Sequence, residues 1–373
     1  MLDITRLMRR AGRVLTGVDR VELAYLRALL ADPVPVFGLI RTRYGYLLLD
    51  QTGLARMEAR LAGGEDGPAW SKARRLAIGR APPPLLGRML RRKLPPGVAY
   101  LNVGHSNLTQ RVLTTIKAAV DARVCVMIHD LIPVDFPQYQ RDGVAKAFAN
   151  MLTRVGRHAD LILCNSVDTQ TRLAAHLPDA PPTIVAHLGT EVAVAESGDI
   201  PQGTVPRRPY FVCVGTIEPR KNHALLLDLW EDWGADAPGL VIAGNRGWKN
   251  EDVFARLDAL PPDGPVRVAH GLSDGAIAAL MQGSHGLLFP SHGEGYGLPA
   301  MEAAARGVPV VANDLPVFHE VLGNIPIYAN ATDRYLWKKK IEALAKRTPS
   351  QAPGAQFVPP TWDAHFKTVL RVT

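Results

Sequence analysis

The sequence has 373 residues, 47% of them apolar and 21% charged, and this composition is that of a folded protein long enough for two domains. No apolar run approaches the roughly 20 residues of a membrane-spanning helix, and the acidic start Met1-Leu2-Asp3 is unlike a secretory signal. The three cysteines, Cys125, Cys164 and Cys213, each lie in an apolar run and are predicted to be buried thiols in a reducing compartment, not a disulfide frame.

The formal net charge of +8 is unevenly distributed along the chain. Residues 1–200 hold 26 Lys and Arg against 18 Asp and Glu, a balance of +8, whereas the remainder holds 17 of each. Much of the excess lies in residues 72–93, where basic and apolar residues alternate. Such a stretch is able to lie on an anionic membrane surface, and a solvated helix face with an ordinary core side explains it equally well. Nucleic acid is not expected as a partner, because no aromatic residues interleave this charge.

Short apolar runs alternate with helical segments along the whole chain, which favours an α/β architecture with parallel sheets. In the first half we predict strands near residues 2–5, 34–41, 98–103, 123–128, 160–164 and 183–186. Helices are predicted near 18–31, 108–120, 143–157 and 168–176. Residues 191–208 are rich in Gly and Pro and predict a linker.

In the second half we predict strands near 209–215, 239–243, 265–269, 286–290 and 308–312. Helices are predicted near 222–233, 251–259, 274–282 and 299–306, with Asp274 as a helix N-cap. A last helix is expected to open near Thr361-Trp362.

Polar residues and glycines follow several of the predicted strands. In the first half these are Gly17 and Arg20, Gly104-His105-Ser106, His129-Asp130 and Asn165-Ser166. In the second half, Gly244 and Gly271-Leu272 follow two predicted strands. Carboxyl ends of parallel strands share one edge of a sheet, so these residues are candidates for a ligand site.

The strand near 209–215 ends in Gly215-Thr216, and Arg220-Lys221 precede the next helix. The planar guanidinium offers a fork of donors and the ammonium a point charge, which together suit a diphosphate. An ordinary basic turn is the alternative interpretation.

The longest motif is His292-Gly293-Glu294-Gly295-Tyr296-Gly297-Leu298-Pro299-Ala300-Met301-Glu302. Pro299 suits the first turn of a helix, and the free N–H groups at such a helix start attract an anion. Carboxylates such as Glu294 and Glu302 accept hydrogen bonds from a diol. A phosphate cradle between diol-binding groups is what a nucleotide-sugar requires.

This motif, with Pro290-Ser291 before it, resembles the donor-site signature of family 4 glycosyltransferases (glycosyl transferases group 1), which are retaining enzymes of the GT-B fold. The turn Gly215-Thr216-Ile217-Glu218-Pro219-Arg220-Lys221-Asn222 is similar to the diphosphate-binding turn of that family, and His129-Asp130-Leu131 to a motif of its mannosyltransferases. Residues 42–97 match no pattern of the family.

The resemblance implies an α/β protein of two Rossmann-like domains that face a central cleft. Residues 1–190 would form an acceptor-binding domain, 191–208 a linker, 209–358 a donor-binding domain, and 359–373 a helix that returns to the first domain.

The resemblance also assigns roles to residues of this sequence. Catalytic roles would go to Glu294, His129, Arg220 and Lys221. Donor contacts, besides Arg220 and Lys221, would come from Gly17, Gly215, Gly244, Gly271, Leu272, Gly295, Tyr296, Gly297, Leu298 and Glu302. From their positions after predicted strands, and not from the resemblance alone, acceptor contacts are expected from Asp130, His105, Ser106, Asn165, Ser166 and Arg20. No metal and no other cofactor is expected, and no Asp-x-Asp motif is present.

The activity implied is retaining transfer of a sugar from a nucleotide-diphosphate donor to a hydroxyl of a surface glycan or lipid-linked acceptor. The mannosyltransferase-like motif favours GDP-mannose, with UDP-sugars next. The expected location is the cytoplasm, with residues 72–93 against the inner face of the membrane. A GT-B epimerase or hydrolase of nucleotide-sugars, and an inactive glycan-binding scaffold, remain as alternatives.

Overall fold

The computed structural model describes residues 1–62, 69–206, 209–347 and 357–371, so parts of the predicted linker and of the 209–358 and 359–373 ranges lie outside the described residues. The chain divides into two compact units. The first consists of Met1–Leu131, Ala147–Leu188 and Trp362–Thr373, and the second of Ile132–Lys146 and Gly189–Thr361. The segment Ile132–Lys146 thus groups with the second unit, whereas the sequence analysis assigned it to the first domain.

The first unit is built on an eight-stranded sheet in the order β4-β3-β2-β1-β5-β6-β7-β8. The strands are β1 (Leu2–Asp3), β2 (Gly38–Arg41), β3 (Tyr46–Leu49), β4 (Gly79–Ala81), β5 (Ala99–Asn102), β6 (Arg123–Ile128), β7 (Leu161–Cys164) and β8 (Thr183–Val185). Leu2 pairs in parallel with Gly38 on one side and Leu101 on the other, so β1 lies inside the sheet. Among the described strands, β3 pairs antiparallel with both β2 and β4, and neither β3 nor β4 was predicted.

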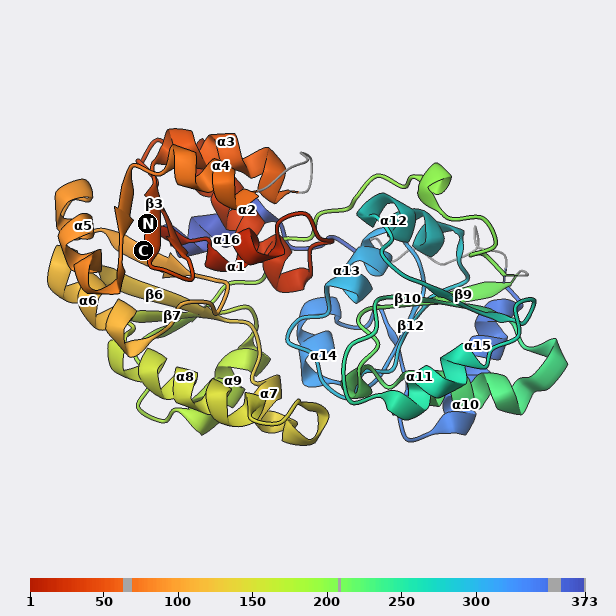
Figure 1. Cartoon of the computed structure of the whole chain (residues 1–373). Helices are drawn as coiled ribbons and strands as arrows, with labels where there is room; N and C mark the ends of the chain where they lie inside the picture. Colours follow the sequence, from red (N-terminus) through yellow and green to blue (C-terminus); the bar gives the residue numbers. More distant parts are fainter. Residues whose placement is uncertain (63–68, 207–208, 348–356, 372–373) are drawn as a thin grey trace. The chain divides into compact units, whose positions relative to one another are not determined.

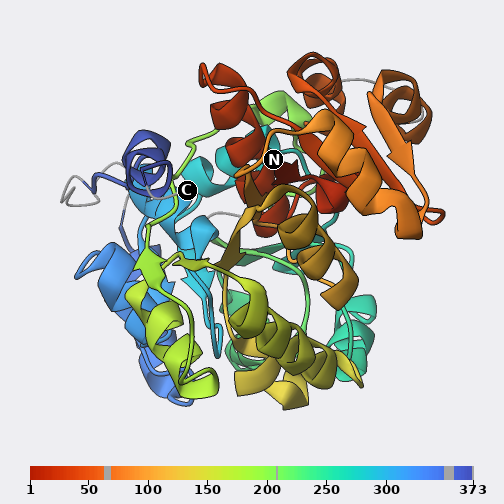
Figure 2. The ribbon, with the colours of Figure 1, turned by 90° about the vertical axis from the view of Figure 1, so that its left-hand side faces the viewer.

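Helices cover both faces of this sheet, as expected for parallel strands. They are α1 (Thr5–Arg10), α2 (Gly17–Ala31), α3 (Gln51–Leu61), α4 (Ala69–Leu76), α5 (Leu86–Lys93), α6 (Gln110–Val120), α8 (Val144–His158), α9 (Val167–His176) and α16 (Trp362–Val369). Helices α1 and α2 lie on one side of the strands, and α8 and α9 on the other (Figure 1). The turned view in Figure 2 shows the same separation of the red and yellow-green helices.

The basic stretch 72–93 forms parts of α4 and α5, with β4 between them. Its apolar residues Ala73, Leu86, Met89 and Leu90 are buried inside the unit. The basic residues of α5 are exposed: Arg88, Arg91, Arg92 and Lys93. The two helices therefore have a core side and a solvated side. The burial of these four residues favours a helix face with an ordinary core side, and contact of the exposed basic side with a membrane stays a prediction.

The second unit has a six-stranded sheet in the order β11-β10-β9-β12-β13-β14, and every pairing is parallel. The strands are β9 (Tyr210–Val214), β10 (Gly239–Ala243), β11 (Val266–Ala269), β12 (Leu287–Phe289), β13 (Val310–Ala312) and β14 (Ile327–Tyr328). Strands β9 and β12 are neighbours at the centre of the sheet, so the loops after them begin side by side.

The helices of this unit are α7 (Ile132–Asp135), α10 (His223–Trp233), α11 (Glu251–Asp258), α12 (Asp274–Gly283), α13 (Leu298–Ala305), α14 (Pro316–Leu322) and α15 (Arg334–Ala345). Helices α12 and α13 cover one face of the sheet, and α10, α11 and α15 the other (Figure 1). On the latter face Trp230, Trp337 and Ile341 pack against strand residues such as Phe211 and Ile242. The sequence analysis did not predict β14, α14 or α15.

Helix α12 differs from its prediction at its first turn. Asp274 is the first helical residue, and the N-cap is Ser273, whose hydroxyl accepts a hydrogen bond from the N–H of Ala276. A serine hydroxyl caps as well as a carboxylate, so the sequence pair Ser-Asp left either residue possible.

Helix α16 packs on α2 of the first unit through a buried polar contact. The hydroxyl of Tyr25 lies 2.8 Å from Nε2 of His365, and Nδ1 of His365 lies 3.0 Å from the carbonyl oxygen of His187. Because a carbonyl only accepts, Nδ1 carries the proton and Nε2 accepts from Tyr25. Burial lowers the pKa of His365 to about 4, so the ring is neutral near pH 7.

Among the described residues, the structure contains no helix long and apolar enough to cross a membrane.

We predict that Tyr25→Phe lowers the free energy of unfolding of the first unit by about 1–3 kcal/mol, because it leaves a buried imidazole nitrogen without its donor. Urea unfolding followed by circular dichroism measures this loss. Tyr44→Phe is the matched control, since Tyr44 is 71% exposed. Equal unfolding midpoints for the two variants would show that the contact does not hold α16 in place.

Candidate functional site

The loops after β9 and β10 run alongside each other at the carboxyl edge of the second sheet. The N–H of Ile217 donates to the carbonyl oxygen of Asn245 (2.9 Å), and the N–H of Gly247 donates to that of Ile217 (3.0 Å). A Cβ on Gly244 would lie 1.8 Å from the carbonyl oxygen of Gly215, so this close approach requires glycine. Gly215 and Gly244, both predicted to bind the donor, therefore allow the loop after β9 to pass close to the loop after β10.

The loop after β12 joins the same edge. The N–H of His292 donates to the carbonyl oxygen of Arg220 (2.8 Å), which links this loop to the turn after β9. Helix α13 begins after Gly297, whose φ is +89° and whose Cβ position lies 2.6 Å from the ring of Phe318. A residue with a side chain would be both strained and obstructed there. Residues 72 positions apart in the sequence, Arg220 and His292, are thus fixed beside each other.

Where these two loops meet, four charged side chains form a cluster of Glu218, Arg220, Lys221 and Glu294. Lys221 Nζ lies 2.6 Å from Glu294 Oε1, and Arg220 lies 3.1 Å from Glu294 Oε2 and 2.5 Å from Glu218. Arg220 also donates to the carbonyl oxygen of Gly293. The side chains are only 5–13% exposed. The structure thus brings three predicted catalytic residues into direct contact.

The protonation of Glu294 follows from this contact. Burial alone raises the pKa of Glu294, but the charges of Lys221 and Arg220 and the hydrogen bond from Lys221 outweigh it and lower the pKa to about 2. Glu294 is therefore a carboxylate at neutral pH, able to accept hydrogen bonds and unable to donate a proton.

The other predicted donor-binding residues lie on the same sheet edge. Glu302 is 9% exposed in the second turn of α13, and Tyr296 is 4% exposed in the loop before it. Gly271 (φ +65°) and Leu272 follow β11 and precede α12. Gly295 and Leu298 complete the loop and the start of α13. All of these residues follow the carboxyl ends of β11 and β12, two strands of the same parallel sheet, and this is the usual ligand-binding edge of such a sheet.

The segment Ile132–Lys146 contributes residues that the sequence analysis did not name. The ring of Tyr139 stacks on His292 (centroids 5.5 Å apart, planes at 15°) and on Phe136 (6.1 Å, 19°). Trp248 Nε1 donates to the carbonyl oxygen of Tyr139 (2.8 Å), and a Cβ on Gly293 would lie 2.7 Å from Phe136. This segment supports the loop that carries Glu294. Aromatic residues soon after the His129-Asp130 motif were the only sequence signal for it.

In the first unit, buried His129 and half-buried His105 form a pair. Their rings are 5.1 Å apart, and their Nε2 atoms lie 2.6 Å and 2.8 Å from the carbonyl oxygens of Val103 and Met127. Burial lowers the pKa of His129 to about 3 and of His105 to about 4, so both rings are neutral. Each ring thus donates one hydrogen bond to the backbone.

The remaining predicted acceptor residues surround this pair. Asn165 donates to the carbonyl oxygen of His129 (2.9 Å), and the hydroxyl of Ser166 accepts from the N–H of Thr169 at the start of α9. The carbonyl oxygen of Ser106 accepts from Asn102. The side chains of Asn165 and Ser166 are therefore already engaged within the unit, and Asp130 is half-buried.

Gly17 and Arg20 lie at the start of α2. Gly17 is the first residue of the helix, and the N–H of Thr16 donates to Asp19 (2.7 Å). Asp19 also accepts from Arg6 (2.6 Å) and Arg10 (3.2 Å), so this buried carboxylate fixes the loop. Arg20 is half-buried one position further on.

The structure gathers no three His, Cys, Asp or Glu side chains as a metal site would require, within the residues that it describes. The three cysteines are free and buried, as predicted.

Residues 199–348 match the family model described as "Glycosyl transferases group 1". Among curated proteins, the serotype-specific mannosyltransferase WbdA of Escherichia coli is 29% identical over 299 residues, which cover 67% of this chain and 37% of WbdA. The O-antigen chain mannosyltransferase RfbU of Salmonella typhimurium is 32% identical over 135 residues, 36% of this chain and 38% of RfbU. The chain therefore spans little more than a third of the curated relatives it matches.

Solved structures show the same fold. HepE of Anabaena, in complex with UDP, aligns with a TM-score of 0.61 and 14% identity over 99% of this chain and 93% of HepE. An E. coli structure entitled trehalose-6-phosphate, bound with UDP-2-fluoro glucose, aligns with a TM-score of 0.59 and 12% identity over 99% of this chain and 95% of that one. The fold expected from the sequence is confirmed: the chain has the GT-B fold, and its residues 199–348 match the glycosyl transferases group 1 family model.

Proposed function

We propose that this protein is a retaining glycosyltransferase that moves a sugar from a nucleotide-diphosphate donor to a hydroxyl of a glycan acceptor. The observation that carries the proposal is the cluster of Arg220, Lys221 and Glu294 beside the start of α13, inside the family-matching domain. Two cations and a helix N-terminus provide positive potential for a diphosphate. A permanently ionised carboxylate at the same place suits the hydroxyls of a sugar.

Charge balance suggests how a donor would enter this cluster. Arg220 and Lys221 carry two positive charges, and Glu218 and Glu294 carry two negative charges, so the cluster is neutral. A diphosphate adds negative charge, and its oxygens would compete with Glu294 for the two cations. In our proposal the diphosphate takes over Arg220 and Lys221, and Glu294 turns to the hydroxyls of the transferred sugar.

In the transition state, negative charge would grow on the departing diphosphate. Arg220, Lys221 and the N–H groups of α13 would then stabilise that charge without the need for a metal, and such electrostatic stabilisation is a large term in catalysis. The departing phosphate would accept the proton of the acceptor hydroxyl as the new bond forms on the same face of the sugar. Glu302 would bind the ribose diol.

GDP-mannose is our preferred donor, because the relatives WbdA and RfbU are mannosyltransferases and the motif His129-Asp130 resembles one found in mannosyltransferases of the family. UDP-sugars come next. By the same likeness, the proposed acceptor is a surface polysaccharide of O-antigen type, elongated at the inner face of the membrane.

Two alternatives to transfer differ from it in the products that they would give. An epimerase or hydrolase of nucleotide-sugars would consume the donor without a glycan acceptor. A glycan-binding scaffold would bind the glycan without donor turnover. Product analysis with and without acceptor distinguishes the three activities.

The first test is a thermal-shift screen of the full chain with GDP, UDP, ADP and their common sugar conjugates. A nucleotide at about 100 times its Kd should stabilise the native state by about 2.7 kcal/mol. Arg220→Ala and Lys221→Ala should each weaken binding at least about tenfold, as the loss of a charge-assisted hydrogen bond predicts. Lys339→Ala, which changes an exposed lysine of the same unit, is the control. If no nucleotide stabilises the wild type, the scaffold alternative gains support.

We predict that Glu294→Gln changes binding and transfer in opposite directions. Removal of the competing carboxylate should tighten the binding of the free nucleoside diphosphate by about three- to tenfold, or about 0.7–1.4 kcal/mol. Transfer should fall by about 10²–10³-fold, because the sugar loses a preorganised partner. Calorimetry and a transfer assay with labelled donor measure the two effects. Weaker binding of the nucleoside diphosphate would contradict the proposed exchange of partners.

The low pKa of Glu294 predicts a specific dependence of stability on pH. A carboxyl whose pKa falls from 4.5 to about 2 on folding stabilises the protein above pH 4.5, and this contribution is lost as the pH falls toward 2. Between pH 5 and pH 3 the wild type should therefore lose about 2 kcal/mol more unfolding free energy than Glu294→Gln. Urea titrations of both proteins at the two pH values measure the difference. Parallel losses would mean that Glu294 is not ion-paired in the folded protein.

A further inference from the structure

A second concentration of positive charge lies in the first unit, outside the residues that the family resemblance assigns. A cavity of about 240 Å³ opens at the carboxyl end of β2. It is lined by Arg41, Thr42, Tyr46, Pro83, Thr109 and Arg111, among others. The turn between β2 and β3, the segment before α5 and the start of α6 thus meet at one cavity.

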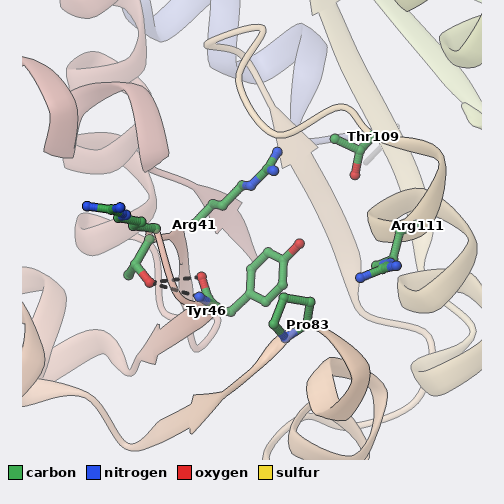
Figure 3. A pocket seen from close by; sticks show the side chains of 8 residues that line it. Arg41, Tyr46, Pro83, Thr109 and Arg111 are labelled. Carbon is green, nitrogen blue, oxygen red and sulfur yellow. Dashed lines mark hydrogen bonds between the residues drawn. The ribbon is translucent and has the colours of Figure 1, made fainter.

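The polar ends of four of these side chains converge. In Figure 3, Arg41, the hydroxyl of Tyr46, Thr109 and Arg111 point toward a common space. Burial raises the pKa of Tyr46, while the charges of Arg41 and Arg111 act in the opposite direction, so both guanidinium groups lie close to its hydroxyl. The hydroxyl stays protonated at neutral pH and is a hydrogen-bond donor.

Over the described residues, the structure gives neither Arg41 nor Arg111 a carboxylate partner, whereas Arg6, Arg27 and Arg172 each have one. Asp3, the carboxylate that influences Tyr46, accepts hydrogen bonds from Tyr100, Asn107 and the N–H of Thr5. Two unneutralised cations beside a hydroxyl donor in a cavity are typical of an anion-binding site.

The backbone adds to this potential. Thr109 is the N-cap of α6, a helix of 11 residues, and its hydroxyl accepts from the N–H of Val112 (3.3 Å). The cavity therefore lies at the positive end of a helix. Arg43, on the same turn, lines the cavity as a third cation. A diphosphate carries more negative charge than a carboxylate, so a site with three cations suits a diphosphate better.

Two exposed apolar side chains lie near lining residues of the cavity in the sequence. Tyr44 is 71% exposed between Arg43 and Gly45, and Leu85 is 47% exposed just after the lining residue Pro83. A Cβ on Gly45 would lie 2.1 Å from the carbonyl oxygen of Ala81, so the turn packs tightly on the segment that leads to Leu85. An anion bound here would have exposed apolar side chains beside it, which suits an anion attached to a hydrocarbon chain.

We propose that this cavity binds the diphosphate of a lipid-linked acceptor, with Arg41, Arg111 and the hydroxyl of Tyr46 as its partners. Its role as an acceptor subsite rests on the proposed function, whereas its ability to bind a phosphate ester does not. The cavity lies at the carboxyl end of β2, on the edge of the first sheet where open α/β sheets bind ligands. Part of it comes from residues 42–97, which no family pattern explained.

Binding is tested by calorimetric titration of geranyl diphosphate into the full chain. The double variant Arg41→Gln/Arg111→Gln should weaken one class of site at least tenfold, and Tyr46→Phe should weaken it a few fold. Arg220→Gln/Lys221→Gln, in the other unit, should leave that class unchanged. Arg123→Gln is the control for general charge, because Arg123 is exposed at the first residue of β6. Loss of all diphosphate binding in the Arg220/Lys221 variant, or equal weakening by Arg123→Gln, would overturn the proposal.

Glucose 1-phosphate distinguishes the two possible sources of the phosphate ester. Tighter binding of geranyl diphosphate than of glucose 1-phosphate supports a lipid-linked acceptor. The reverse order overturns the lipid assignment in favour of a soluble sugar phosphate, and no binding of either ligand overturns the site itself.

A kinetic experiment tests the role of the site in transfer. The same acceptor glycan is supplied on a polyprenyl diphosphate or on a neutral octyl group. Arg41→Gln/Arg111→Gln should raise KM for the diphosphate acceptor at least tenfold and leave kcat and KM for the octyl glycoside unchanged. An equal effect on both acceptors would contradict the subsite. No transfer by the wild type would refute the proposed function and leave the calorimetric result standing.

Discussion

The buried ion pairs of Glu294 with Arg220 and Lys221 are the interaction on which the second unit depends at its functional edge. Charges with side chains only 8–13% exposed are costly unless they are paired, and removal of one partner leaves the other uncompensated. The turn after β9 and the loop after β12 must therefore keep one relative position. The tight glycine contacts of Gly215 with Gly244, and of Gly293 with Phe136, allow the backbone to hold that position. The stacked rings of Phe136 and Tyr139 cover the same loop.

The pairing that stabilises these loops also bears on the proposed reaction. Arg220 and Lys221 are held in place by carboxylates before any donor binds, so the entropy of ordering two long side chains is already spent in folding. A diphosphate that replaces Glu294 would meet donors that are ordered and partly desolvated. The cost is competition from that carboxylate. In the proposed reaction this cost has a use, because the displaced carboxylate becomes available beside the sugar only when a diphosphate is present.

Much of the fold followed from the sequence because parallel strands covered on both faces are short apolar runs between helices. Strands such as β6 and β10 agree with their predictions. The sequence did not predict strands β3 and β4 or helices α3 to α5. Antiparallel edge strands break that alternation, and residues 42–97 fit no family pattern. The alternation of basic and apolar residues in 72–93 was correctly interpreted as amphipathic. Sequence periodicity alone, however, does not distinguish an apolar side that packs in the protein core from one that contacts a membrane. For the site, proximity of residues after neighbouring strands was predictable. The pairing of Glu294 with both cations was not, because it joins positions 73 residues apart through side-chain geometry.

The two positively charged places in this chain differ in one physical respect, which is whether the protein neutralises its own cations. At Arg220 and Lys221 it does so, and any anion must first displace a carboxylate. At Arg41 and Arg111 no described carboxylate does so, and the full potential of both guanidinium groups is available to a ligand. A protein gains no stability from two unneutralised arginines that face one cavity, since like charges repel. A ligand that supplies the missing negative charge would account for both arginines. A donor that arrives and leaves in every cycle suits a site with an internal competitor, because easy release accompanies each turnover. An acceptor that must be held while its other end reacts suits a site without one.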